Sequence, residues 1–120
     1  MTLSKKRFFG YVSIGKIVMA EKEKALIDCL LFPKYAGGIK EIRKAILSSI
    51  KSLDRKKLID YALRVESRVV IRRLGFLLEE FQFKDSKILK KNIGAGYELL
   101  DPTLKKKNNL NKKWLLDINL

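Results

Sequence analysis

The stretch SRVVIRRLGFLLEEF, residues 67–81, is strongly helical in character. Ser67 stands just before its first apolar residues and can accept a hydrogen bond from a free N–H group, so we expect a helix from Arg68 to about Phe81. Gly75 interrupts this stretch at a cost of about 1 kcal/mol relative to alanine. Such a glycine predicts close packing of another backbone against the helix, with a break in the helix as the alternative.

Three more helices are predicted on the N-terminal side of this stretch. Over 21–32, stacked i,i+4 pairs such as Leu26 with Leu30 predict a helix that Pro33 ends. After the glycine pair at 37–38, apolar residues at helical spacing predict an amphipathic helix. These residues are Ile39, Ile42, Ile46, Ile50 and Leu53. Asp54 can cap a third helix, with an inner face of Leu58, Tyr61, Ala62 and Val65.

The two ends of the chain are predicted to contain strands. Residues 7–20 are rich in Phe, Tyr, Val and Ile and predict two short strands joined near Gly15. Residues 85–93 predict one more short helix, and residues 97–120 predict a β-hairpin whose connection, 105–109, has the composition of an exposed flexible loop. One face of its last strand would carry Trp114, Leu116, Ile118 and Leu120.

These segments together predict an α+β fold. A helix-rich middle of four to five helices is flanked by short N-terminal strands and a C-terminal β-hairpin, forming a small sheet that holds the termini together. A length of 120 residues is typical of a single domain, so we expect residues 1–120 to form one.

The chain is strongly basic. Its 27 Lys and Arg residues outnumber 13 Asp and Glu residues, and the formal net charge of +14 is shared by both halves. Such a field attracts polyanions whatever the fold. Nucleic acid, an acidic protein face and an anionic membrane all have the required sign.

Several residue types that support catalysis are absent or scarce. The chain has no histidine, which removes the commonest general base and the Ser-His and Cys-His nucleophile pairs. One cysteine, Cys29, cannot supply a zinc site without histidine, and its apolar surroundings predict a buried, inert thiol. A magnesium site made only of carboxylates would have to use Glu23, Asp28, Asp60 or Asp101, and helix ends, solvated faces and a turn explain these residues better. We therefore expect a non-enzyme with no metal or cofactor.

The sequence has no apolar segment near the roughly 18 residues of a membrane span and no signal peptide. We expect a cytoplasmic protein that is not bound to a membrane.

Two groups of basic residues are the candidate contacts for a polyanion or partner. Arg68 and Arg72 are four residues apart on the predicted helix, with Arg73 beside them, so they could present guanidinium groups to phosphates or carboxylates. Pairing with nearby acids as a solvated face is the alternative. The predicted hairpin carries five cations suited to a nucleic-acid backbone, or to a solubilising loop: Lys105, Lys106, Lys107, Lys112 and Lys113.

The aromatic residues fall largely at predicted core positions. They are Phe8, Phe9, Tyr11, Phe76, Tyr97 and Trp114. This placement argues against an exposed platform on which bases would stack.

Six fragments lie in order along the chain: RFFG at 7–10, EKALID at 23–28, YAGG at 35–38, RRLGFLLE at 72–79, LDP at 100–102 and NKKW at 111–114. In order and spacing they resemble the C-terminal domain of AbiEi-type antitoxins, the transcriptional-regulator component of abortive-infection, virus-defence toxin–antitoxin systems. The resemblance spans almost the whole chain. One departure is local, because the family's helix usually opens with a proline just before the Glu-Lys-Ala-Leu core, where this chain has Lys22.

The resemblance implies an antitoxin that opposes a nucleotidyltransferase-like toxin, either by contacting it or by acting on its RNA target. Such antitoxins usually carry an N-terminal winged helix-turn-helix that binds the promoter. This sequence begins just before the matching region, so we expect that module to be absent. Promoter binding is then not expected of this chain unless a longer parent or a separate chain supplies the DNA-binding part. A stand-alone basic protein that binds DNA or RNA remains the alternative.

Overall fold

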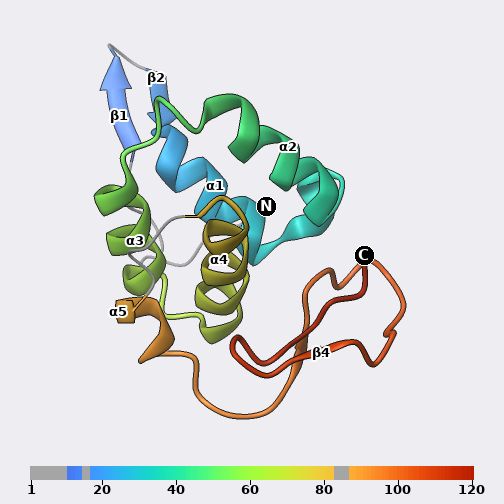
Figure 1. The fold of residues 1–120 in the computed structure, drawn as a ribbon. Coiled ribbons are helices and arrows are strands. Elements are labelled where there is room, and N and C mark those ends of the chain that lie inside the picture. Colours follow the sequence, from blue (N-terminus) through green and yellow to red (C-terminus); the bar gives the residue numbers. More distant parts are fainter. Residues whose placement is uncertain (1–10, 15–16, 83–86) are drawn as a thin grey trace.

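The computed structural model describes residues 11–14, 17–82 and 87–120 (Figure 1). Its elements follow in the order β1 (Tyr11–Ile14), β2 (Ile17–Ala20), α1 (Lys22–Leu31), the 3-10 helix η2 (Pro33–Ala36), α2 (Ile39–Ser49), α3 (Arg55–Arg64), α4 (Arg68–Glu80), α5 (Lys87–Lys90), β3 (Glu98–Leu99), β4 (Leu110–Asn111) and β5 (Leu116–Asp117). The fold is α+β, as the sequence predicts. The helix predictions are confirmed, and η2 is an addition between α1 and α2.

Helices α1 and α4 lie at the centre, where α1 contacts α2, α3 and α4 (Figure 1). The core is built from the apolar faces predicted for these helices. Its fully buried members include Ile27, Leu30, Ile39, Ile46, Leu58, Ala62, Leu74 and Leu77. Each leucine or isoleucine side chain removed from water contributes about 1.5–3 kcal/mol, so this four-helix core is the main source of stability.

Two helix starts are capped as predicted. The Asp54 carboxylate accepts the N–H of Lys57 at 3.1 Å, and the Ser67 hydroxyl accepts the N–H of Val70 at 3.4 Å. Helix α2 is capped from far along the chain, because Asp101 Oδ2 accepts the N–H of Ile39 at 3.0 Å. A Cβ at Gly38 would lie 2.9 Å from the same oxygen, so this glycine leaves room for the cap.

The C-terminal region differs from a plain hairpin. Strand β5 lies between β3 and β4, antiparallel to β4 and parallel to β3, so residues 97–120 form a mixed three-stranded sheet. Strands β1 and β2 pair antiparallel in a separate sheet, with Tyr11 opposite Ala20. In the part of the chain that the structure describes, the two sheets lie at opposite ends of the molecule (Figure 1), so the prediction that one sheet holds the termini together is wrong.

Trp114 joins the C-terminal sheet to the helices. Its side chain is fully buried, and a Cβ built on Gly75 would lie 2.3 Å from two of its ring carbons. The indole N–H donates to Glu79 Oε2 at 3.2 Å. Gly75 is therefore explained by close packing, as predicted, although the neighbour is a side chain and not a backbone.

Candidate functional site

Two of the three predicted arginine contacts are buried. Arg72 is 2% exposed and Arg73 is 4% exposed. Arg72 donates to the carbonyl oxygens of Ile93 and Ala95 at 2.7–2.9 Å, and Arg73 donates to those of Leu30 and Leu99 at 2.8 and 3.1 Å. The prediction that Arg68, Arg72 and Arg73 share an exposed face is wrong, because distant carbonyl groups draw two of them inward.

Burial affects the charge of these guanidinium groups without removing it. Desolvation lowers the pKa of Arg72, and it lowers the pKa of Arg73 to about 10, while the Glu98 carboxylate opposes both shifts. Both side chains stay cationic at neutral pH. Arg72 holds the loop carbonyls of Ile93 and Ala95 against α4, and Arg73 bonds the carbonyls of Leu30 at the end of α1 and Leu99 in β3. Their role in this structure is to fix the C-terminal region onto the helices.

Arg68 is the exposed member of the three. Its side chain lies over the loop after α5, where a Cβ on Gly94 would come within 2.7 Å of the Arg68 Cδ. It remains available to a partner, but as a single cation.

Four lysines gather around a depression of about 380 Å³ between α5 and the β4–β5 turn, which we call the lysine hollow: Lys87, Lys90, Lys91 and Lys113. The ammonium groups of Lys90 and Lys113 lie 5.7 and 6.0 Å from the ring centroid of Trp114. Lys90 also donates to the backbone carbonyl of Lys113, and Lys113 pairs with Glu79 at 2.5 Å. Of these residues only Lys113 was a candidate from the sequence. Lys87 and Lys90 on α5, and Lys91 directly after it, were missed because nothing local in the sequence links them to a turn more than twenty residues away.

The other predicted lysines are exposed. Lys112 adjoins the hollow in sequence, and Lys105, Lys106 and Lys107 lie on the segment between β3 and β4. This segment has a defined anchor, because the buried Asp117 carboxylate accepts the N–H groups of Lys107, Asn108 and Asn109, each at 3.0 Å. The loop predicted to be flexible is thus held at three consecutive residues.

A second depression, of about 440 Å³, lies over the C-terminal sheet, and we call it the Tyr97 depression. Leu99 and Asp117 form its floor, and exposed residues form its rim: Tyr97, Glu98, Lys106, Asn108 and Leu110. Tyr97 was predicted to be a core residue, but its side chain is 43% exposed. Trp114 is buried and Phe76 is partly buried, as predicted, while Phe8, Phe9 and the side chain of Tyr11 lie outside the described residues.

The acidic residues weighed as a magnesium site do not come together. Glu23 Oε2 accepts the N–H of Asp54, Asp28 pairs with Lys24, and Asp101 caps α2. Within residues 11–14, 17–82 and 87–120, no group of three or more Asp, Glu, His or Cys residues could hold a metal ion. Asp60 lies in a groove between α3 and α5 that also contains Asp54, Lys56 and Lys57, so this groove has mixed charge.

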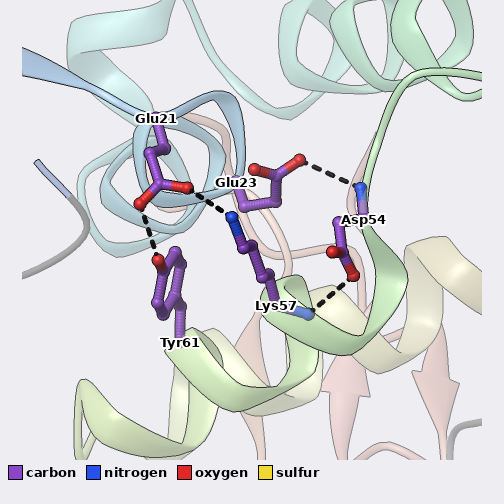
Figure 2. A network of polar contacts seen from close by, with 5 residues as sticks. All are labelled: Glu21, Glu23, Asp54, Lys57 and Tyr61. Carbon is purple, nitrogen blue, oxygen red and sulfur yellow. Dashed lines mark hydrogen bonds and ion pairs between the residues drawn. The ribbon is translucent and has the colours of Figure 1, made fainter. Parts of the chain in front are cut away.

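A polar network joins the start of α1 to α3 (Figure 2). Glu21 accepts hydrogen bonds from Lys57 at 3.0 Å and from the Tyr61 hydroxyl at 2.8 Å. The bond from Lys57 lowers the pKa of Glu21 most, and the same carboxylate raises the pKa of both Lys57 and Tyr61. Each pKa therefore moves away from neutrality, whereas acid–base catalysis needs values near the working pH. The network ties two helices together.

Cys29 is partly buried. Burial raises the pKa of its thiol, and the nearby Asp28 adds to the shift. The thiol is protonated at neutral pH, which agrees with the inert cysteine expected from the sequence.

No protein family, curated protein or solved structure matches this chain. The resemblance to AbiEi-type antitoxins therefore stays a prediction. None of the helices in the described part of the chain has the length and apolar character that crossing a membrane requires.

Proposed function

We propose that the protein is a non-catalytic, cytoplasmic, antitoxin-like interaction domain of a prokaryotic virus-defence system, which opposes a nucleotidyltransferase-like toxin. The lysine hollow is its contact surface for an acidic face of the toxin. The fragments that resemble the antitoxin family support this biological role, and the lysine hollow supports contact through opposite charges.

One observation carries the choice of surface: four exposed lysines surround one depression, and an ion pair with Glu79 offsets the charge of Lys113. Among the described residues, three cations and four carboxylates are buried, so the buried charges nearly balance. The excess of positive charge therefore lies on the surface of the protein. Exposed charges of one sign steer an oppositely charged partner and set the association rate.

The test is co-expression with the product of a neighbouring reading frame that encodes a nucleotidyltransferase-like toxin. The wild-type chain should restore growth. A hollow variant with Lys87, Lys90, Lys91 and Lys113 changed to Gln should lose this protection. The matched control changes four exposed lysines elsewhere, Lys34, Lys40, Lys51 and Lys56, and lowers the net charge equally. Failure of the wild-type chain to protect contradicts the antitoxin role, and equal protection by both variants contradicts the choice of surface.

A stand-alone nucleic-acid-binding protein is the second candidate, because the same hollow fits phosphates. Salt dependence separates the two. In generic polyanion binding, the logarithm of the affinity falls steeply and linearly with the logarithm of the salt concentration. This holds for many different nucleic-acid sequences. A specific complex with one protein should persist at moderate salt and saturate at a fixed ratio.

Catalysis is tested directly by incubating the protein with RNA and DNA in the presence of divalent ions. We expect no turnover above the background of a mock preparation. Turnover that follows the protein through purification would contradict the non-catalytic role.

A further inference from the structure

The Tyr97 depression combines an aromatic ring, an apolar side chain and a cation in one hollow. Tyr97 is 43% exposed and Leu110 is 49% exposed, so both leave apolar surface in water. The volume of about 440 Å³ is within the range of small-ligand sites, roughly 300–1,000 Å³. Such a hollow is suited to a flat ring that lies against Tyr97.

The backbone that carries the rim is held in place before any ligand binds. Asp117 accepts three consecutive N–H groups, from Lys107 to Asn109, and this anchor fixes the segment on both sides of the Asn108 side chain. A rim ordered in advance loses less conformational entropy when it binds. Lys106 and Asn108 therefore form a defined part of the rim.

The lining carries one cation, Lys106, and two carboxylates, Glu98 and Asp117. The Asp117 oxygens already accept three N–H groups, so a phosphate would be held at the Lys106 side of the depression. Lys106 is exposed and stands between Lys105 and Lys107, which are also exposed. The one exposed acid of the rim is Glu98, and its charge is offset by Arg72 and Arg73, whose pKa values it raises against the effect of burial. A phosphate next to Lys106 would lie beside three consecutive exposed lysines.

We propose that the Tyr97 depression binds one nucleotide of a single-stranded nucleic acid, with its base stacked on Tyr97 and its phosphate at Lys106. The strand has to be single, because in a duplex the faces of the bases are covered by their neighbours. The Asn108 amide can donate to and accept from the edge of the base. This inference goes beyond the proposed antitoxin role, since it needs no toxin.

The experiment measures fluorescence anisotropy of a labelled single-stranded RNA of mixed sequence with the purified full chain. Tyr97→Ala should weaken binding about 5- to 150-fold, the loss expected for one base–aromatic stack. Tyr97→Phe should bind within about twofold of wild type, because its ring still stacks. Tyr35→Ala is the matched control, since Tyr35 is 71% exposed and lies away from the depression on η2, and it should not change binding.

The salt dependence of binding distinguishes the contribution of the Tyr97 ring from that of the Lys106 charge. The loss caused by Tyr97→Ala should be the same at every salt concentration, because a stack releases no counterions. Lys106→Gln should reduce the slope of log affinity against log salt by about 0.7, the release expected for one phosphate of a single strand. Lys40→Gln, an exposed lysine on α2, should reduce it less.

Three results would overturn the proposal: equal binding by wild type and Tyr97→Ala, tighter binding of a duplex of the same length, or no binding of RNA or single-stranded DNA at low salt. Parallel titrations with DNA decide which sugar is preferred. Photo-crosslinking of RNA that contains 4-thiouridine should label the peptide around Tyr97. These measurements use no toxin, so their failure leaves the co-expression result untouched, and the reverse also holds.

Discussion

Replacing Gly75 with alanine tests how the C-terminal sheet is attached to the helices. On an exposed helix this change would stabilise the protein by about 1 kcal/mol, because alanine is the better helix former. Here the new Cβ would lie 2.3, 2.3 and 2.7 Å from three carbons of the Trp114 ring. Real Cβ atoms do not approach other atoms below 3.0 Å, so the ring or the helix has to move.

The ring has little freedom to move. The indole N–H of Trp114 donates to Glu79, and the backbone N–H of Trp114 donates to Asn111 Oδ1 at 2.9 Å. Overpacking of a core costs about 1–3 kcal/mol, and a fixed ring places this site at the upper end. About 3 kcal/mol of steric cost less about 1 kcal/mol of helix propensity leaves a net loss of about 2 kcal/mol. The melting temperature should fall by about 8 °C, at roughly 4 °C per kcal/mol for a domain of this size.

Urea unfolding followed by circular dichroism measures the free energy of unfolding. Trp114 is the only tryptophan, so its emission reports on this contact alone, and Gly75→Ala should shift the emission to the red. In a Trp114→Leu background the same change should no longer destabilise the protein, since the ring is gone. A Gly75→Ala protein as stable as wild type, with unchanged emission, would refute the packing argument.

Three further changes have defined expectations. Arg72→Lys should cost about 2 kcal/mol of unfolding free energy, because one ammonium group cannot replace a planar guanidinium bonded to several carbonyls; an unchanged urea midpoint would contradict its structural role. Asp117→Asn should cost about 2 kcal/mol and speed amide hydrogen exchange at 107–109, measured by NMR, and continued protection there would contradict the anchor. Burial alone would raise the pKa of Asp101, but the hydrogen bonds from Thr103 and from the N–H of Ile39 outweigh it, and the net pKa is lowered. The unfolded chain therefore takes up this proton first, so the stability due to Asp101 is present above about pH 4 and is lost as the pH falls through the folded pKa. Urea midpoints at pH 7, 4 and 3 should show this loss of stability in acid for the wild type and a smaller loss for Asp101→Asn.

The helices could be predicted from the sequence because their signals are local. The i,i+4 pairs around Leu26 and Leu30, the glycines before α2 and the caps at Asp54 and Ser67 act within one or two turns, and the structure confirms each of these helices. Gly75 also predicted a close contact, because a glycine in the interior of a helix lowers its stability unless close packing requires it.

The tertiary structure alone decided the candidate sites. Arg72 looks like a surface residue in the helical pattern, but carbonyl groups from residues 93 and 95 bury it. Lys87, Lys90 and Lys91 meet Lys113 only because Trp114 brings the β4–β5 turn against α4. Tyr97 lies directly before β3, an edge strand of the C-terminal sheet, and its side chain is 43% exposed. Local periodicity records which side of a helix is apolar, whereas burial of an arginine and assembly of a lysine hollow depend on which distant segments pack together.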